Sequence, residues 1–308
     1  MSLTSMRSLM FKLGFIGAGT VGSTLALQLS DKGYPVVAVS SRRRTSASNL
    51  ARKISGCLSA TDNQKVADAA ELVFITTPDD AIASVASQTK WYHGQMVVHC
   101  SGADSTDVLE PARKGGAEVG VFHPLQTFAG AEQARENLLG VTFALEAEEP
   151  LLKTLKEMAK VLGGHWIDLK PGAKVAYHAA AVIASNYLVT LVKMATSLWQ
   201  TFGVPETEAT RALLPLIRGT VRNIETTGIP DCLTGPIARG DTGTIKKHLE
   251  VLNRTDADML ATYRELGLRT IPIALAKGSI NKPQAQELRA ILSLKIKPRM
   301  GGANENYA

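Results

Sequence analysis

Cysteine is scarce in this sequence. The 3 cysteines among 308 residues, Cys57, Cys100 and Cys232, are odd in number and show no paired spacing. They exclude a disulfide-stapled secreted module and a cysteine-based zinc site, and they favour a reducing cytoplasm. The dispersed histidines predict no other metal site. We expect no membrane-spanning helix, which needs about 18 uncharged apolar residues in a row, and no export signal.

Aromatic residues are also few, at 5% of the chain, while 34 Lys+Arg against 28 Asp+Glu give a net charge of +6. A basic chain attracts nucleic acid, but so few aromatics leave little surface on which bases could stack. The only tight basic run is Arg42–Arg44, and the basic residues of the tail, 294–308, lie in a segment that we expect to be disordered. We therefore expect no nucleic-acid partner.

What is present is a chain long enough for two domains, with 45% hydrophobic residues. Over residues 11–170, short apolar runs alternate with helix-length segments, which is typical of an α/β domain with a mostly parallel sheet. The predicted strands are KLGFIG, PVVAVS, ELVFITT, QMVVHCS, EVGVFH, VTFALE and HWIDL, with helices over 20–32, 45–55 and 103–114. Residues 171–293 predict an all-α domain, with helices over 173–202, 206–226, 242–265 and 269–293.

The strongest local motif is KLGFIGAGTVGSTLA, in which an apolar strand is followed by glycines in G-x-G-x-x-G spacing and then by a helix. Gly17 permits a tight turn, Gly19 leaves room for a pyrophosphate, and Gly22 lets the helix pack on the strand. The free amides at the start of that helix would bind phosphates. The motif predicts a Rossmann dinucleotide-binding domain, with cofactor contacts from Gly17, Ala18, Gly19, Thr20, Val21 and Gly22.

The end of the next strand favours NADP(H) over NAD(H). An acidic residue there would bind a free ribose 2′-hydroxyl, but Ser40 and Ser41 occupy the position. The guanidinium groups of Arg42 and Arg43 suit a 2′-phosphate, so we expect Ser41, Arg42 and Arg43 to bind the cofactor. The alternative is a solvated basic turn.

Two further loops follow predicted strands, at Thr77 and Pro78 and at Ser101 and Gly102. Ligands of open parallel sheets lie outside the carboxyl ends of the strands, so we expect Thr77, Pro78 and Ser101 to border the cofactor. Ordinary strand-to-helix turns are the alternative.

Taken together, GFIGAGTVG, VVHCSGA, VFHPLQTF, YHAAAVIASNYL and LTGPIARGD resemble the DUF2520 Rossmann-like proteins. That group is related to ketopantoate reductase, pyrroline-5-carboxylate reductase, prephenate dehydrogenase, and the 6-phosphogluconate and 3-hydroxyisobutyrate dehydrogenases. The likeness runs over about residues 11–293. It implies an N-terminal NADP-binding domain and a helical C-terminal domain that helps to form a dimer.

The catalytic relatives place a lysine or histidine and an asparagine on the first long helix of the second domain. At about 100° per residue, Lys174, His178 and Ser185 share one face of that helix here, with Asn186 some 80° round. The relatives' pattern of lysine followed four residues later by asparagine is absent, because His178 takes that place. A hydrogen-bonded core histidine is the alternative for His178.

Other polar residues gather in VFHPLQTF and LTGPIARGDTGTIKKHL. His123 is expected at the carboxyl edge of the sheet, in a site or in a structural hydrogen bond. Arg239 is suited to a carboxylate or phosphate, whereas Asp241 is expected to cap a helix and His248 to be structural.

These residues predict an NADP(H)-dependent oxidoreductase that moves a hydride between nicotinamide and a small carbonyl or imine compound with an anionic group. His178 would donate a proton or polarise the substrate, Ser185 and Asn186 would orient it, and Arg239 would hold its charge. The alternative is a protein that binds or senses NADP(H) without turnover. A homodimer is expected, because the helices over 174–202 and 208–221 are too apolar for a monomer.

Overall fold

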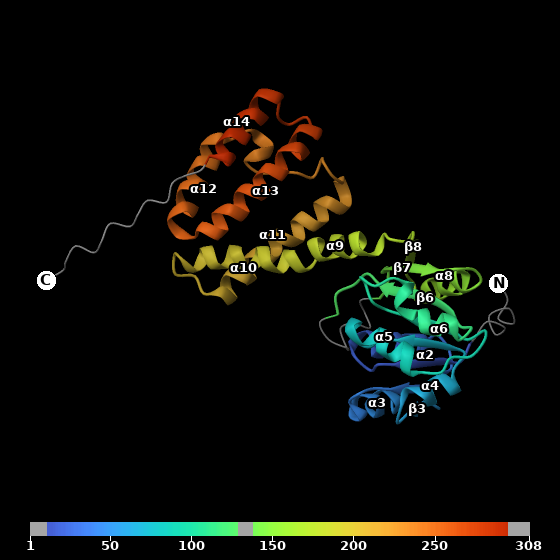
Figure 1. Ribbon diagram of the computed structural model, residues 1–308. Helices are drawn as coiled ribbons and strands as arrows, with labels where there is room; N and C mark the ends of the chain where they lie inside the picture. The colour runs from blue at the N-terminus through green and yellow to red at the C-terminus, as the bar shows by residue number, and fades with distance from the viewer. Residues whose placement is uncertain (1–10, 129–137, 295–308) are drawn as a thin grey trace. The chain divides into compact units, whose positions relative to one another are not determined.

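The computed structural model describes residues 11–128 and 138–294 (Figure 1). The chain divides into two compact units that change over between Leu188 and Val189. The predicted domain boundary at residue 171 stays a prediction, and the helix that begins at Lys174 is counted with the first unit. Apart from Leu294, the tail that we expected to be disordered lies outside the described residues.

The first unit contains an eight-stranded sheet in the order β3-β2-β1-β4-β5-β6-β7-β8. All neighbours pair in parallel except β6 and β7, which are antiparallel, so the predicted α/β class with a mostly parallel sheet is confirmed. All seven predicted strands are present and β3 is additional. The strands are β1 (Leu13–Ile16), β2 (Val36–Ser40), β3 (Leu58–Ser59), β4 (Leu72–Ile75), β5 (Met96–His99), β6 (Glu118–Pro124), β7 (Thr142–Ala147) and β8 (His165–Asp168).

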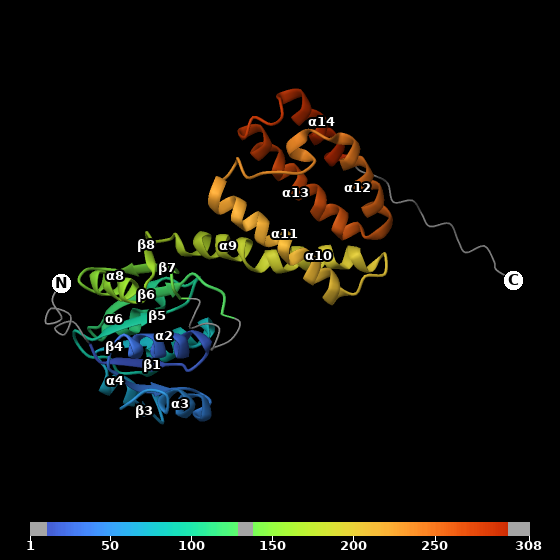
Figure 2. The same ribbon diagram turned by 180° about the vertical axis from the view of Figure 1, so that it is seen from behind.

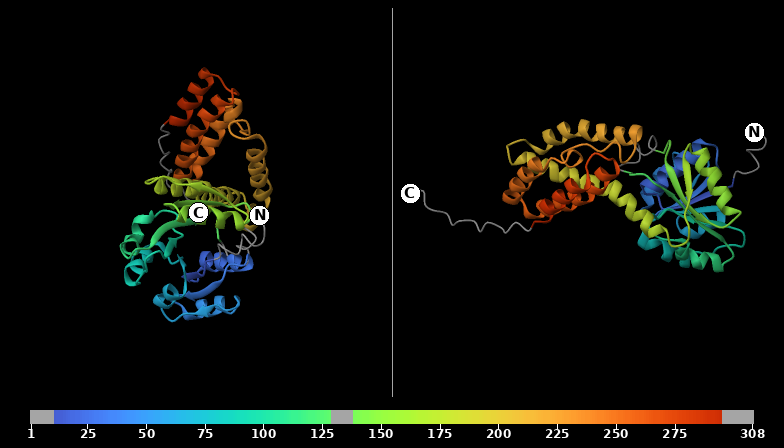
Figure 3. Two further views of the ribbon diagram at one scale, coloured as in Figure 1. Left: turned by 90° about the vertical axis from the view of Figure 1, so that its right-hand side faces the viewer. Right: turned by 90° about the horizontal axis from the view of Figure 1, so that it is seen from above.

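Helices cover both faces of this sheet (Figure 3). One core packs α2 (Thr20–Asp31), α3 (Arg44–Ala51) and α8 (Leu151–Val161) against the strands, and includes Phe15, Phe74 and Phe122. The opposite core holds α4 (Asn63–Ala69), α5 (Asp79–Gln88) and α6 (Glu110–Lys114). Because both faces are covered, β1, β4 and β5 are buried along their whole length, which explains their continuous apolar runs.

Several helix boundaries differ from the prediction. Helices α4, α5 and α8 were not predicted, and the expected helix over 103–114 is a 3-10 helix, η1 (Thr106–Leu109), followed by α6. The expected helix over 173–202 is broken at Ser185 into α9 (Lys174–Ala184) and α10 (Asn186–Gln200).

The second unit is all-helical, and Figure 2 labels its helices from behind. After α11 (Glu206–Thr227) and the 3-10 helix η2 (Ile237–Arg239) it has α12 (Thr242–Thr255), α13 (Ala257–Ala276) and α14 (Lys282–Ser293). The two helices predicted over 242–265 and 269–293 are wrong, because the structure has three helices in this region. Asp256 starts a new helix by accepting from the amides of Asp258 and Met259. Gly267 lies inside α13 and does not end it. Its missing side chain lets Leu292 of α14 pack close to the backbone.

One helical segment bears on the expectation that the chain has no membrane-spanning helix. Residues 175–192, between Lys174 and Lys193, contain no Asp, Glu, Lys or Arg. Over Lys174–Gln200 the helical segment is long and apolar enough to cross a membrane. Its most apolar 18 residues have a mean hydropathy of 1.5, and none of them is buried. One such helix is weak evidence for a membrane span, because length and composition alone also fit helices that a soluble protein buries.

Candidate functional site

The glycine motif forms the turn between β1 and α2. Gly17 has a φ of 116°, and a Cβ there would lie 2.6 Å from the carbonyl carbon of Thr76. A Cβ on Gly22 would lie 2.3 Å from Thr76 Oγ1, so this glycine lets α2 pack against the end of β4. A Cβ on Gly19 would meet nothing within 4 Å. Gly17 and Gly22 are therefore required by packing, whereas Gly19 leaves the backbone open to a ligand.

A cavity of about 610 Å³ lies at the carboxyl ends of β1, β2 and β4, and we call it the glycine-turn cavity. Of the predicted cofactor residues, it is lined by Gly17, Ala18, Gly19, Ser41, Arg42, Arg43, Thr77 and Pro78. Four others, Thr20, Val21, Gly22 and Ser101, do not line it. The Thr77 Oγ1 is buried and has no hydrogen-bond partner among the described residues, so it is available to a bound group. These residues fit a dinucleotide.

The rim of this cavity beyond β2 is basic. The side chains of Arg42, Arg43 and Arg44 are exposed there, and Ser40 donates to Asn63 Oδ1 at 2.8 Å. Asp62 also lines the cavity, but its carboxylate accepts the amide of Lys65 and caps α4. This end of the cavity therefore combines hydroxyls with guanidinium groups, which suit a 2′-phosphate.

Ser101 shapes the loop after β5. Its hydroxyl donates to Asp79 Oδ2 at 2.8 Å and accepts from the amides of Ala103 and Asp104. Asp79 is the first residue of α5 and was not singled out from the sequence. Ser101 thereby ties the carboxyl ends of β4 and β5 together, at the sheet edge where it was expected.

Lys174, at the start of α9, is 2% exposed and donates from Nζ to the carbonyl oxygen of Ser101. Burial lowers the pKa of this ammonium to about 8, although the carboxylate of Glu146 acts in the opposite direction. The sequence placed Lys174 on the cleft-facing side of its helix. The structure instead places it beneath the loop after β5.

His99, at the end of β5, is buried and has a fixed tautomer. Its Nδ1 accepts the Ser101 amide at 3.1 Å, so the proton is on Nε2, which donates to the carbonyl of Ser105. Burial lowers the pKa of His99 to about 4, and burial with the nearby charge of Lys174 lowers that of His123 to about 3. Both imidazoles are neutral in the folded protein at neutral pH.

The lowered pKa values predict acid sensitivity. As pH falls from 6.5 to about 4, the unfolded chain binds a proton at His99 and the folded chain does not, so stability is lost across this window. We expect His99→Gln to flatten the decline in the free energy of unfolding by on the order of 1 kcal/mol per pH unit. Denaturant titrations at a series of pH values measure this. His165→Gln, in the exposed strand β8, is the control, and equal slopes for all three proteins would refute the assignment.

A second cavity, which we call the α9 cavity, also encloses about 610 Å³. It lies beside the residues that follow β6 and along α9, within the first unit, and is lined by His123, Leu125, Gln126, Thr127, Tyr177, His178, Ala180, Ala181, Val182, Ala184, Ser185 and Asn186. The structure thus brings together three predicted site residues, His178, Ser185 and Asn186. Arg239 lies on η2 in the helical unit with its side chain exposed.

The loop after β5 also packs against this group. A Cβ on Gly102 would lie 2.5 Å from Cδ2 of His178 and 2.9 Å from Nε2 of His123. The glycine therefore lets both imidazoles rest on the backbone. Tyr177, which precedes His178 in YHAAA and was not predicted as a site residue, lines the same cavity. The expected structural roles of Asp241 and His248 are confirmed, because Asp241 caps α12 and His248 bonds Tyr263.

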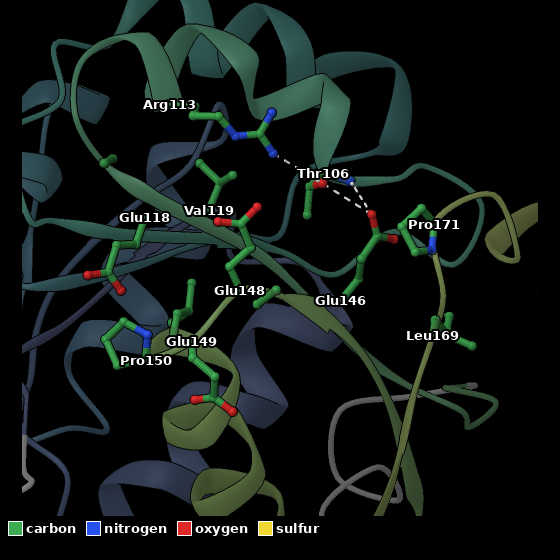
Figure 4. Close-up of a pocket in the computed structure, with 13 residues that line it drawn as sticks. Thr106, Arg113, Glu118, Val119, Glu146, Glu148, Glu149, Pro150, Leu169 and Pro171 are labelled. Atoms are coloured by element: carbon green, nitrogen blue, oxygen red, sulfur yellow. Dashed lines mark hydrogen bonds between the residues drawn. The ribbon is translucent and has the colours of Figure 1, made fainter.

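Figure 4 shows a third cavity, of about 360 Å³, near Glu118 at the opposite end of β6 from His123. In it the Glu146 carboxylate accepts from the amide and hydroxyl of Thr106, and Arg113 donates to the same hydroxyl. This acidic pocket lies apart from the two cavities at the carboxyl edge of the sheet.

The glycine turn and the basic rim are features of proteins that bind NADP(H) in a Rossmann domain. A family described as "NADP oxidoreductase coenzyme F420-dependent" matches residues 12–102, which confirms NADP(H) as the cofactor. The domain of unknown function DUF2520 matches residues 141–270. The resemblance to the DUF2520 proteins that the motifs predicted is therefore confirmed over this part of the chain.

Individual proteins are similar over larger parts of the chain. A structure of BF3122 from Bacteroides fragilis, described as a candidate NADP oxidoreductase, is 27% identical with a TM-score of 0.68, covering 86% of this chain and 99% of that one. TM1727 from Thermotoga maritima has the same identity and coverage, with a TM-score of 0.70. The 2-(hydroxymethyl)glutarate dehydrogenase of Eubacterium barkeri is 27% identical over 160 residues, 49% of this chain, so the match spans about half (51%) of that curated relative.

Proposed function

We propose that this protein is an NADP(H)-dependent oxidoreductase that transfers a hydride between nicotinamide and a small carbonyl or imine compound bearing an anionic group. The observation that carries the proposal is the position of the two large cavities at the carboxyl edge of one sheet. The glycine-turn cavity lies at β1, β2 and β4, and the α9 cavity follows β6. In the strand order, β5 and its Ser101–Gly102 loop stand between them, so the edge offers a cofactor site and a substrate site together.

The bound nicotinamide supplies or accepts the hydride, and the protein contributes binding, orientation and electrostatics. The amides of the glycine turn and the guanidinium groups of Arg42 and Arg43 would hold the phosphates. In the α9 cavity, His178 would donate a proton to the substrate or polarise it, and Ser185 and Asn186 would orient it.

The anionic group is supported by the name of the Eubacterium barkeri relative, whose substrate is a hydroxymethyl dicarboxylate. The role of Arg239, on η2 in the helical unit, stays a prediction from its chemistry, since a guanidinium can bind a carboxylate with two hydrogen bonds.

A non-catalytic NADP(H)-binding or sensing protein is the second candidate. It is favoured by Lys174, because this lysine is buried against the Ser101 carbonyl and does not line the α9 cavity. A sensor needs only the glycine-turn cavity and its basic rim.

The near-ultraviolet absorbance of NADPH separates the two candidates. We would incubate the protein and NADPH with succinic semialdehyde, ethyl levulinate and pyrroline, which represent an anionic aldehyde, a neutral ketone and a cyclic imine. Loss of absorbance that depends on both protein and probe supports the oxidoreductase. Tight NADPH binding without turnover of any probe supports the sensor.

The surfaces of α9, α10 and α11 support a homodimer. Ten of their large apolar side chains are 39–71% exposed: Val175, Ile183, Tyr187, Leu188, Val189, Leu191, Leu214, Leu216, Val221 and Ile224. Their exposed area is on the order of the roughly 800 Å² per partner that a stable interface buries. The arginines of α11, among them Arg218 and Arg222, favour a second copy of the chain over a membrane as the cover.

Sedimentation is therefore expected to give about twice the monomer mass of 32.9 kDa at micromolar concentration. Leu216→Glu should shift the protein toward monomer, because it places a charge at an apolar interface. Leu58→Glu, which alters an exposed leucine on β3, should leave the mass unchanged. A wild-type monomer would contradict the dimer.

A further inference from the structure

Tyr177 and His123 form a hydrogen-bonded pair in the α9 cavity. The Tyr177 hydroxyl lies 2.8 Å from His123 Nδ1, and the two rings meet edge to face with centroids 5.6 Å apart. Tyr177 comes from the first turn of α9 and His123 from the end of β6, so the pair joins the helix to the sheet edge. Both residues line the cavity, which makes the phenol accessible to a small ligand.

A second pair in the chain has nearly the same geometry. His248 Nδ1 lies 2.8 Å from the Tyr263 hydroxyl, with ring centroids 5.8 Å apart. That pair borders a cavity whose other lining residues are mostly aliphatic, among them Leu191, Met194 and Leu252. The Tyr177 pair instead shares its cavity with polar side chains, including His178, Ser185 and Asn186. The surroundings, rather than the hydrogen bond, distinguish the two.

We propose that Tyr177 is the proton donor to the substrate's carbonyl oxygen or imine nitrogen, and that His123 positions its hydroxyl. This inference rests on the proposed oxidoreductase function. A hydride adds to the substrate carbon, and the π electron pair of the C=O or C=N bond moves onto the oxygen or nitrogen. That atom forms a bond to the Tyr177 proton while the phenol O–H bond breaks. Water then returns a proton to the phenolate. The hydride would come from bound NADPH, which would thereby be oxidised to NADP⁺.

The position of His123 suits this role. With its proton on Nδ1, the imidazole donates to the Tyr177 oxygen and leaves the phenol proton free to point into the cavity. The same hydrogen bond stabilises the phenolate as it forms. Gly102 holds the other edge of the ring, since any Cβ there would collide with His123 Nε2. His123 is thus fixed by backbone on one side and by the phenol on the other.

The electrostatics agree with a neutral donor. Burial raises the pKa of Tyr177 to about 12, so the phenol keeps its proton at neutral pH. It is still a stronger acid than the alcohol that would form from a carbonyl, so the transfer runs downhill. His178, whose ring centroid lies 6.4 Å from that of His123, remains available to polarise the substrate from the same helix.

The test compares Tyr177→Phe with its matched control Tyr263→Phe, because each variant loses one phenol that is bonded to a histidine. With a probe that the wild type reduces, Tyr177→Phe should lower kcat by roughly a hundredfold or more and change KM little. It should also lose the solvent deuterium isotope effect on the chemical step. NADPH affinity, measured by fluorescence without substrate, should be unchanged in both variants, and Tyr263→Phe should keep the wild-type kcat.

His123 is tested by rescue. His123→Ala should lower kcat, whereas His123→Asn should recover at least tenfold over the alanine variant, because the Asn amide nitrogen can take the place of Nδ1. Equal rates for Tyr177→Phe and wild type would overturn the donor assignment and leave the oxidoreductase standing. Equal losses in the Tyr177 and Tyr263 variants would also overturn it. NADPH binding without reduction of any probe would overturn the proposed function and this inference together.

Discussion

Replacing His178 with alanine is expected to lower turnover by roughly a hundredfold or more while leaving NADPH affinity nearly unchanged. The imidazole lines the α9 cavity and packs against the backbone of Gly102, whereas the glycine-turn cavity that would hold the phosphates has no lining residue from α9. Removing it should therefore affect the substrate step and leave the main cofactor contacts intact. Steady-state rates of NADPH oxidation and a fluorescence titration of NADPH measure the two quantities separately.

His248→Ala is the matched control, because His248 bonds a tyrosine in the helical unit and should affect stability more than turnover. If His178 has only a structural role, the expected result for His178→Ala is the opposite of that for a catalytic role. Its loss would then lower the temperature of unfolding and leave the rate per folded molecule at the wild-type level. That result would end the catalytic assignment, although the dinucleotide site would be unaffected.

The second large effect is expected in cofactor choice. NADPH should bind more tightly than NADH, and replacing Arg42 and Arg43 with alanine should weaken NADPH selectively. Each lost charged hydrogen bond is worth on the order of 1.5–3 kcal/mol, or roughly ten- to a hundredfold in affinity. The reason is local, because both guanidinium groups line the cavity beyond β2 where Ser40 and Ser41 replace an acidic residue.

Isothermal titration of each nucleotide into wild type and variant measures the selectivity. Arg269→Ala, which removes one arginine charge from an exposed ion pair with Glu265, controls for the loss of positive charge elsewhere on the surface. Its affinity for NADPH should match that of the wild type. Equal affinities of the wild type for NADPH and NADH would show that the arginines form only a solvated turn.

Local patterns predicted the parts of this fold that depend on neighbouring residues. The β1 turn and the start of α2 follow from three glycines within six positions, and the structure shows why Gly17 and Gly22 are needed there. Parallel strands that are buried on both faces have continuous apolar runs in the sequence, so each strand could be predicted separately. The short helix α4 could not, because its 7 residues give too little periodicity.

The candidate site was predicted only in part. His178, Ser185 and Asn186 were found because they share one short segment, and the structure places them on one cavity. Tyr177 was missed, since its partner His123 is 54 residues away and no local pattern joins them. The predicted position of Lys174 was also wrong. Helical periodicity gives the direction of its side chain, but it does not show that the loop after β5 covers this lysine.

The sequence by itself determined the dinucleotide-binding turn, the preference for NADP(H), the α/β sheet followed by helices, and the segment that carries His178. Each of these depends on residues that are close in the chain, where backbone sterics, spacing and charge act directly. Only the tertiary structure decided that Ser101 ties β5 to Asp79, that Lys174 is buried and that Tyr177 meets His123. These pairings join distant segments, and they follow from the order in which parallel strands assemble rather than from any local pattern.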